Sequence, residues 1–448
     1  MPRNSSTVSP KQQRIAQLAE QSPQMSFTSL AYLMDLDWLR EAYRRTRKDG
    51  AVGIDGQSAS DYERDLEANL QSLLDRAKSG RYQAPPVRRA HIPKPGSPTQ
   101  TRPIGIPTLE DKLLQRAVAM LLEPIYEHDF HDSSYGFRPG RSAHQALDQL
   151  WQQLMDRHGG WIVEVDIQQF FDTLDHNHLR AFLRQRIRDG VVERLIGKWL
   201  KAGVLEEGKL FFPKAGSPQG GVISPMLANI YLHYVLDEWF EWEIKPRLKG
   251  AAYQVRYGDD FVVGCTGEDD ARRLLAVLPK RFGKYGLKLH PDKTRLIPFL
   301  QPPKAVDGKS GGPGHQVRCF DLLGFTHYWG RSRKGRWVVK RKTSSERMSR
   351  ALHRITQWCR YNRHRPLSEQ QHLLSQKRRG HFAYYGITGN SPALSDFALR
   401  VLLIWRKWLL RRHRANARGR LRLTWLRTQY PLPSARAVHS VCPSVANP

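Results

Sequence analysis

The feature that most restricts the fold of this chain is a pair of apolar segments separated by a short acidic turn. The segment Tyr253–Gly264 is typical of a β-hairpin, because apolar strands flank Gly258-Asp-Asp260. Gly-Asp is common in simple turns, so the turn alone would not indicate a function. These flanking strands are too apolar for a surface hairpin. The sequence therefore predicts acidic side chains at the end of a buried sheet.

A second strand carries another candidate acid. Period-two alternation in Trp161–Ile167 places the apolar side chains on one face and Glu164 and Asp166 on the other. Acids on one face are ordinary at a sheet edge. Together with Asp259 and Asp260, however, Asp166 would suit nucleotidyl transfer, which requires charge neutralisation at the attacking oxygen and at the leaving pyrophosphate. Carboxylates on adjacent strands can hold two Mg²⁺ ions roughly 3.5–4 Å apart for this purpose.

The charge of the chain is its strongest bulk property. It has 72 Lys and Arg against 42 Asp and Glu, a net charge of +30. Residues 341–448 contain 22 of the basic and 3 of the acidic residues, so +19 lies in the last 108 positions. Tryptophans and tyrosines are interleaved with these charges. This pattern favours a nucleic acid as partner over a merely well-solvated surface.

The order of motifs resembles that of the group II intron-encoded reverse transcriptases/maturases. Blocks typical of reverse transcriptases follow one another in the chain. They are Asp166 with Phe170–Asp172, Ser217–Pro225, Tyr257–Asp260, His290–Lys293 and Leu322–Phe325. Upstream, Gly53–Gly56, Arg102–Pro107 and Tyr135–Gly140 look like the group II intron branch. The resemblance extends from about residue 30 to about residue 440.

The resemblance implies roles for individual residues. Asp166, Asp259 and Asp260 are implied as the catalytic ligands of two Mg²⁺ ions. Nucleotide contacts are implied for Lys94, Arg102, Phe171, Gln219 and Lys293. Phe171 would exclude a ribose 2′-hydroxyl by contact, although Phe170 and Phe171 could both belong to the core. Gly324 and Phe325 look like a turn that grips the primer, for which a core strand is the alternative.

The implied fold is an α+β right-hand polymerase with fingers, a palm containing an antiparallel sheet, and a helical thumb. We expect a disordered N-terminus (1–24), an N-terminal extension with fingers (25–158), a palm (159–340), a thumb/maturase domain (341–415) and a basic tail (416–448). Helices are predicted near residues 30–48, 60–79, 109–128, 176–201, 225–242, 269–285, 346–361, 368–386 and 392–413. Strands are predicted near 88–93, 101–106 and 288–299, with short strands within 317–340.

The implied activity is RNA-directed DNA synthesis on intron RNA, with deoxynucleoside triphosphates and a primer-template as substrates. The basic C-terminal segment, including Arg411, Arg412 and Arg414, would bind intron RNA and assist its splicing and mobility. The resemblance is to short bacterial members without an endonuclease domain. Their priming route, target and oligomeric state do not follow from the sequence.

Three alternatives stay open at this point. A splicing factor without polymerase activity is opposed by the intact acids. A relative serving defence or CRISPR adaptation would have the same motifs. An RNA-dependent RNA polymerase shares Gly258-Asp-Asp260, where the intron family usually has Ala at position 258, but it is opposed by Phe171. The absence of an apolar leader, of a membrane-length apolar run and of paired cysteines favours a cytoplasmic protein without membrane association. The resemblance implies a bacterial one.

Overall fold

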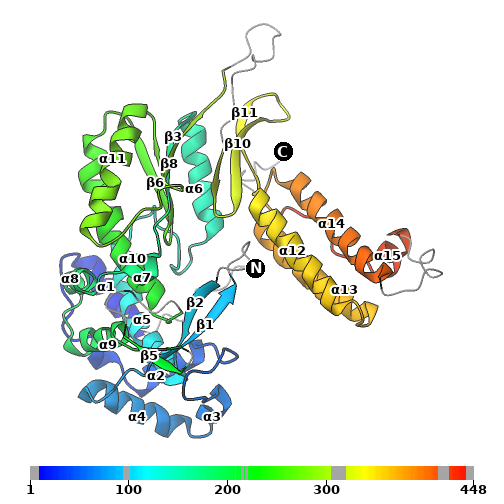
Figure 1. Ribbon diagram of the computed structural model, residues 1–448. Helices are drawn as coiled ribbons and strands as arrows, with labels where there is room; N and C mark the ends of the chain where they lie inside the picture. The colour runs from blue at the N-terminus through cyan, green and yellow to red at the C-terminus, as the bar shows by residue number, and fades with distance from the viewer. Residues whose placement is uncertain are drawn as a thin grey trace. The chain divides into compact units, whose positions relative to one another are not determined.

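A computed structural model describes residues 10–93, 101–206, 208–212, 216, 220–303, 319–411 and 423–439. The chain divides into two compact units. Unit 1 comprises Met1–Ala146 and Val163–Leu296, and unit 2 comprises Leu147–Ile162 and Ile297–Pro448. Both contain helices and β-strands (Figure 1), which confirms the predicted α+β class.

The N-terminal part of unit 1 is built around one buried helix, α5 (Leu109–Asp129). Thr108 begins this helix by accepting a hydrogen bond from the backbone N–H of Asp111. Apolar residues on all sides of α5 are buried, so it forms the centre of a helical layer. The surrounding helices are α1 (Pro10–Gln21), α2 (Leu36–Arg45), α3 (Ala59–Glu63) and α4 (Leu66–Ser79), with a 3₁₀ turn at Ala31–Leu33.

The predicted disorder of residues 1–24 is wrong for the part that the structure describes. Helix α1 buries Ile15 and Ala19 almost completely. Gln12 Nε2 donates to the backbone oxygen of Met120, 2.9 Å away, and fixes α1 on α5. The polar composition of this segment hid two apolar positions at helical spacing, and a partner helix about 100 residues away supplies their burial.

A four-stranded sheet adjoins these helices in unit 1. Its strand order is β2-β1-β4-β5. The strands are β1 (Val87–Pro93), β2 (Thr101–Ile106), β4 (Val204–Glu206) and β5 (Lys209–Phe211). β1 and β2 are antiparallel, with Arg88 opposite Ile106, as the extended segments around residues 88–93 and 101–106 predicted. The β4–β5 hairpin was not predicted, because strands of three residues leave little periodic signal.

The second four-stranded sheet has the order β6-β7-β3-β8 and contains the predicted acidic hairpin. Its strands are β6 (Ala252–Tyr257), β7 (Asp260–Cys265), β3 (Gly159–Val165) and β8 (Arg295–Leu300). The unit boundary passes through β3 and β8. In unit 1, helix α11 (Glu268–Lys284) follows β7 and packs beside the hairpin, with Phe261 and Phe282 stacked (Figure 1).

One long helical segment in unit 1 changes its winding. α10 (Ser224–Leu232) begins with Pro225 in its first turn, as predicted. The chain then continues as two π-helical segments, His233–Asp237 and Trp239–Ile244, and a 3₁₀ turn at Lys245–Arg247. A helix over 225–242 was predicted, but the π winding was not. The remaining helices of this unit are α7 (Phe170–Thr173), α8 (His176–Arg186) and α9 (Gly190–Leu200).

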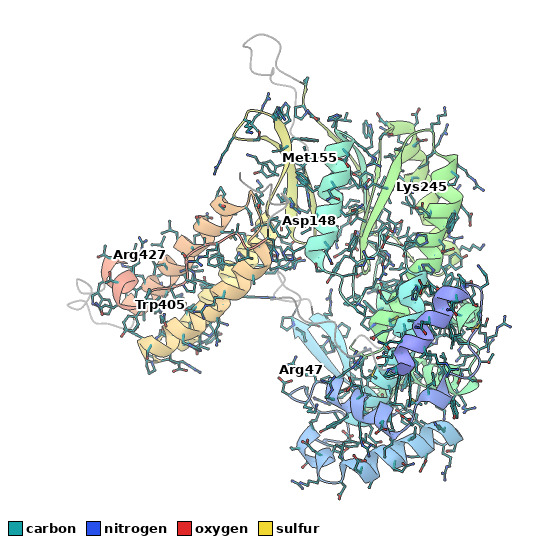
Figure 2. All side chains as sticks on the ribbon, turned by 180° about the vertical axis from the view of Figure 1, so that it is seen from behind. Arg47, Asp148, Met155, Lys245, Trp405 and Arg427 are labelled. Atoms are coloured by element: carbon teal, nitrogen blue, oxygen red, sulfur yellow. The ribbon has the colours of Figure 1, made fainter. Side chains whose placement is uncertain are left out.

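Unit 2 contains an antiparallel sheet and a helical bundle. The sheet has the order β11-β10-β9, from β9 (Phe320–Leu322), β10 (Phe325–Arg331) and β11 (Trp337–Thr343). The helices are α12 (Ser345–Asn362), α13 (Leu367–Tyr385), α14 (Ser391–Leu410) and α15 (Leu423–Gln429). Trp405 of α14, labelled in Figure 2, is fully buried in their core and donates through Nε1 to Gln370. The predicted helices near 346–361, 368–386 and 392–413 are confirmed.

Helix α6 (Ala143–Asp156) was not predicted. In unit 2, Trp151 Nε1 donates to the backbone oxygen of Val339 over 2.8 Å, and Asp148 pairs with the buried Arg341. Asp148 and Met155 are labelled on this helix in Figure 2. No helix in the described part of the chain has the length and apolar character needed to cross a bilayer. The assignment of fingers, palm and thumb to sequence ranges stays a prediction.

Candidate active site

The β6–β7 hairpin presents its acids on a tight two-residue turn. Tyr257 lies opposite Asp260 in the register, so Gly258 and Asp259 form the turn. Gly258 has φ +67°. Because Asp259 does not have a positive φ, this is the pattern of a type II′ turn, in which glycine is favoured at the first central position. The geometry of the turn thus accounts for a glycine at position 258.

Asp166 lies just beyond the end of β3. The backbone N–H of His290 donates to the carbonyl oxygen of Asp166 over 2.8 Å, and Gln168 N–H donates to Lys288 at the same distance. These two bonds hold residues 288–293 next to Asp166. As a result, Lys293 Nζ lies 2.7 Å from Oδ2 of Asp166. Lys293 is predicted to contact the nucleotide, and the structure adds a contact with a predicted metal ligand.

The pKa of Asp259 in the turn depends on acidic and basic side chains around it. Burial raises the pKa of Asp259, and the negative charge of Asp166 raises it further, whereas Arg102 and Arg256 oppose the increase. Asp166 and Asp259 are half-buried, and Asp260 is exposed at the start of β7. The structure therefore brings Asp166, Asp259, Lys293 and Arg102 into one electrostatic neighbourhood.

This donor set fits divalent cations. Carboxylate oxygens are the ligands that Mg²⁺ prefers, and Asp166 and Asp259 come from neighbouring strands of one sheet. The ammonium group of Lys293 already lies at Oδ2 of Asp166, so a positive charge is accommodated at that position. The exposure of Asp260 leaves the site accessible from solvent.

The two phenylalanines after β3 have different environments. Phe170 is buried, whereas Phe171 is half-buried and meets Phe170 edge to face, with ring centroids 5.4 Å apart. Of the two readings of this pair, Phe170 takes the core position. The ring of Phe171 is left partly accessible.

Two glycines that flank residues 217–219 pack closely against these elements. A Cβ on Gly216 would lie 2.8–2.9 Å from the backbone oxygens of Asp172 and Phe171, and Gly216 has φ +94°. Gly220 has φ +116°, and a Cβ on it would lie 2.4 Å from the backbone oxygen of Gly105 in β2. Gln219 and Lys94 themselves lie outside the described residues. Arg102 is exposed on β2, opposite Ile92.

The remaining predicted residues belong to unit 2. Leu323 and Gly324 form the β9–β10 turn with φ +51° and +82°, and Ser344 N–H donates to Gly324. The ring of Phe325 is fully buried against Tyr384 and Tyr385, so any nucleic-acid contact at this position is limited to the backbone.

At the end of α14, Arg411 is exposed, and its guanidinium group lies 4.7 Å from the centre of the Trp408 ring. Arg412 and Arg414 lie outside the described residues.

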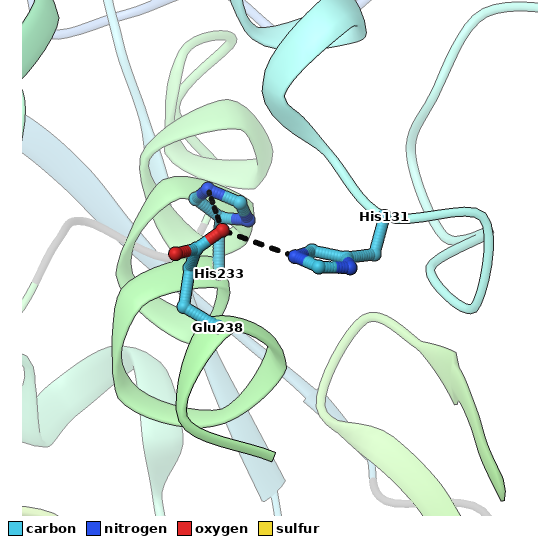
Figure 3. A group of neighbouring side chains, drawn as sticks. All are labelled: His131, His233 and Glu238. Carbon is cyan, nitrogen blue, oxygen red and sulfur yellow. Dashed lines mark hydrogen bonds and ion pairs between the residues drawn. The ribbon is translucent and has the colours of Figure 1, made fainter. Parts of the chain in front are cut away.

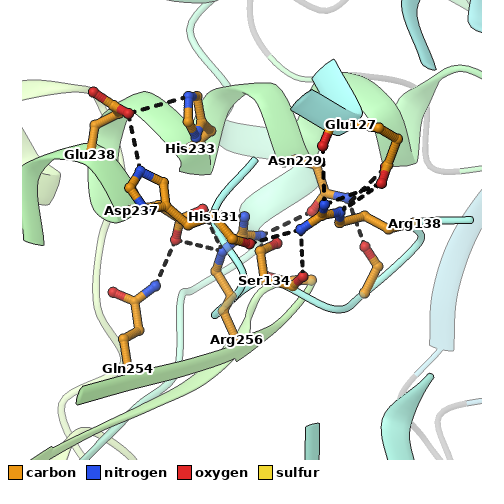
Figure 4. Close-up of polar contacts among 12 residues, drawn as sticks. Glu127, His131, Ser134, Arg138, Asn229, His233, Asp237, Glu238, Gln254 and Arg256 are labelled. Atoms are coloured by element: carbon orange, nitrogen blue, oxygen red, sulfur yellow. Dashed lines mark hydrogen bonds and ion pairs between the residues drawn. The ribbon is translucent and has the colours of Figure 1, made fainter. Parts of the chain in front are cut away.

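A buried ionic network behind the turn was not predicted from the sequence. Arg256 on β6 is fully buried and forms an ion pair with Asp237, also fully buried, at 2.5 Å. It also donates to the side chain of Asn229 and to the backbone oxygen of Gly258, at 2.9 and 3.1 Å (Figure 4). The signal available was a charged residue within an apolar strand. Its partners, 19 and 27 residues earlier, could not be found by local pattern.

Comparison with known proteins gives consistent matches. The family model described as "Reverse transcriptase (RNA-dependent DNA polymerase)" matches residues 92–327, more than half of the chain. "Protein YkfC" of Escherichia coli K12 is 36% identical in an alignment 333 positions long, which covers 64% of this chain and 84% of that protein.

Two further relatives have names that refer to introns. "Group II intron-encoded protein LtrA" of Lactococcus lactis is 35% identical over 282 residues, 60% of this chain and 46% of LtrA. "Nuclear intron maturase 2, mitochondrial" of Arabidopsis thaliana is 29% identical over 232 residues, 43% of this chain and 30% of that protein. This chain thus corresponds to about half of LtrA and to most of YkfC.

Proposed function

Because this chain belongs to the reverse transcriptase (RNA-dependent DNA polymerase) family, in its group II intron-encoded branch, we propose that it extends a primer with deoxynucleotides on an intron RNA template. Its enzyme class is RNA-directed DNA polymerase and its fold class is the right-hand polymerase. The observation that supports the proposal best is the meeting of Asp166 and Asp259 on neighbouring strands beside two cationic side chains.

Reverse transcriptases use divalent metal ions, and we assign Asp166, Asp259 and Asp260 as the ligands of two Mg²⁺ ions. When bound, these ions would lower the charge repulsion between the 3′ oxygen and the triphosphate. Lys293 holds its ammonium group at Asp166, where it can meet a phosphate oxygen of the nucleotide. Arg102 is the second cation, and Lys94 and Gln219 complete the proposed nucleotide contacts.

Sugar selection is assigned to Phe171. Its partly exposed ring is supported by the buried Phe170, which limits how far it can retreat from a ribose 2′-hydroxyl. A hydroxyl pressed against an aromatic ring would also lose its hydrogen bonds to water without replacement. Both effects favour deoxynucleotides.

The nucleic-acid partner is proposed to be group II intron RNA, gripped by the basic segment 341–448. Nucleic acid is the partner class that the family requires, and +19 of the net charge lies in this segment. Phosphate contacts provide affinity with little sequence choice. We propose that the same surface assists splicing and that the protein works in the bacterial cytoplasm.

The direct test is the Asp259→Asn variant, assayed for primer extension on an RNA template with Mg²⁺. The amide keeps the size of the side chain but removes an anionic ligand, so extension should fall on the order of 10²–10³-fold or more. The matched control is Asp269→Asn, an exposed acid in the first turn of α11, which should extend normally. RNA affinity should be unchanged in both variants. Normal extension by Asp259→Asn would refute the ligand assignment.

A further inference from the structure

A cluster of metal-binding side chains lies in unit 1, apart from the catalytic acids. His131 Nε2 is 3.0 Å from Glu238 Oε1, and His233 Nε2 is 3.7 Å from the same oxygen. The three potential ligand atoms all lie within 4.8 Å of one another. Figure 3 shows the carboxylate of Glu238 between the two imidazole rings. His131 follows α5, whereas His233 and Glu238 lie on the π-wound segment.

The π winding is what brings His233 and Glu238 to the same side. In an α-helix, residues five apart point in directions roughly 140° apart. In a π turn the hydrogen bond connects residues i and i+5, and here the backbone N–H of Glu238 bonds to the oxygen of His233. π segments of this kind occur frequently at functional sites. The π winding therefore places His233 and Glu238 on the same side of the helix, where both face His131.

His233 is almost fully buried, and the described residues leave its ring nitrogens poorly partnered. Its side chain is 3% exposed, and Nδ1 has no hydrogen-bond partner among the described residues. Its Nε2 is 3.7 Å from Glu238, beyond hydrogen-bond distance, and is therefore available to a metal ion.

We propose that His131, His233 and Glu238 form a binding site for a divalent transition-metal ion of the Zn²⁺ type. Two imidazoles and one carboxylate, with a water in the fourth position, make a known tetrahedral ligand set. With bonds of 2.0–2.1 Å, ligand atoms in such a site lie roughly 3.4 Å apart. The two distances to Glu238 bracket this value. Imidazole ligands favour Zn²⁺ over Mg²⁺, so the ion would differ from those at the catalytic acids.

The ion would connect two segments that support the β6–β7 turn. His131 precedes Ser133, whose carbonyl accepts from the N–H of Arg256 over 2.8 Å. Glu238 follows Asp237, the partner of Arg256 (Figure 4). The same arginine donates to Gly258 in the catalytic turn. A metal at this position would therefore fix the residues that hold Arg256.

The test measures Zn²⁺ binding by the full-length protein in a large excess of Mg²⁺, which occupies the carboxylate sites. Equilibrium dialysis with metal analysis gives stoichiometry and affinity. Wild type should bind one more Zn²⁺ than His131→Ala or Glu238→Gln, or should bind that ion at least 10–100-fold more tightly, since even outer-shell changes cost that much. The matched control is His128→Ala, an exposed histidine three residues from His131, which should bind as wild type.

Thermal unfolding with and without Zn²⁺ is the second readout. Zn²⁺ should raise the Tm of wild type and of His128→Ala, and this increase should shrink in the two ligand variants. Circular dichroism of the variants checks that they fold. Equal Zn²⁺ binding by His131→Ala and His128→Ala, or no Zn²⁺ retained by wild type, would overturn the proposal and leave His131 and Glu238 as an ordinary ion pair.

Discussion

At the scale of single residues, the surroundings of a side chain decide its role more than its type does. Phe170 and Phe171 are chemically identical neighbours, yet one is buried and the other is partly exposed. Without its 2.7 Å contact to Asp166, Lys293 would resemble any other surface lysine. Such differences come from the chain that folds around each residue.

Replacing Phe171 by Ala should admit ribonucleotides. Removal of the ring opens space for the 2′-hydroxyl, so incorporation of ribonucleotides relative to deoxynucleotides should rise by roughly 10–100-fold, the effect of 1–3 kcal/mol of lost discrimination. The measurement is the ratio of kcat/KM for the two nucleotide types on one primer-template. Phe171→Tyr keeps the ring and should keep the preference. An unchanged ratio for the alanine variant would move the selection to another residue.

The sequence singled out the three acids of the candidate site but not the residues that contact them. Asp166, Asp259 and Asp260 stand out because acids interrupt apolar strands at strand ends, a local signal. The contact between Lys293 and Asp166 joins residues 127 positions apart, and His131 lies 107 positions from Glu238. No local pattern carries information at that range, so only the folded chain reveals these pairs.

At the scale of elements, periodic segments were predicted well and irregular ones were not. Helix α11 was expected over 269–285 and spans Glu268–Lys284. Helix α6 was overlooked although Leu147, Leu150 and Leu154 recur at helical spacing. It has no acidic first turn and no basic last turn to mark its ends. The π winding after Leu232 depends on packing and has no composition signal.

The buried pair Arg256–Asp237 should stabilise the hairpin and position its turn. Arg256→Met leaves Asp237 buried and unpaired, so the free energy of unfolding should fall by about 3–5 kcal/mol, and primer extension should fall as well. The double variant Arg256→Met with Asp237→Leu should regain part of the stability, because no buried charge remains, but not the activity. Urea unfolding and extension assays measure the two effects.

An exposed ion pair provides the control for the Arg256 and Asp237 variants. Arg272 and Glu268 pair on the surface of α11, and Arg272→Met should change the free energy of unfolding by no more than about 1 kcal/mol. If the double variant recovered activity together with stability, the bond from Arg256 to Gly258 would have no positioning role. The pair would then serve stability alone.

At the scale of the whole molecule, charge is distributed unevenly. The last 108 residues carry +19 of +30, whereas Asp166, Asp259 and Asp260 all lie upstream. Arg411 is exposed at the end of α14, and its guanidinium group lies against the ring of the buried Trp408. An exposed cation held in this way suits contact with a phosphate backbone.

Replacing Arg411, Arg412 and Arg414 by Gln should weaken RNA binding and flatten its salt dependence. Each lost phosphate contact on single-stranded RNA lowers the log–log salt slope by about 0.7, so three contacts correspond to about 2. The measurement is RNA affinity at several salt concentrations. A control with the same loss of charge replaces Arg272, Arg273 and Lys280, exposed on α11, by Gln. Identical slopes for both triple variants would mean that net charge alone matters.

The close approach of Gly136 to the β6–β7 turn has a consequence for recombination between relatives. A methyl group on Gly136 would collide with the backbone of Tyr257 and Gly258, and one on Gly258 would lie 3.0 Å from the ring of Phe137. The two segments are closely packed against each other, although about 120 residues separate them in the chain. In a chimera whose crossover lies between them, the two segments come from different parents. Their contact surfaces have then not evolved together. Parents for such chimeras should therefore be chosen so that residues 134–138 and 255–261 come from the same protein.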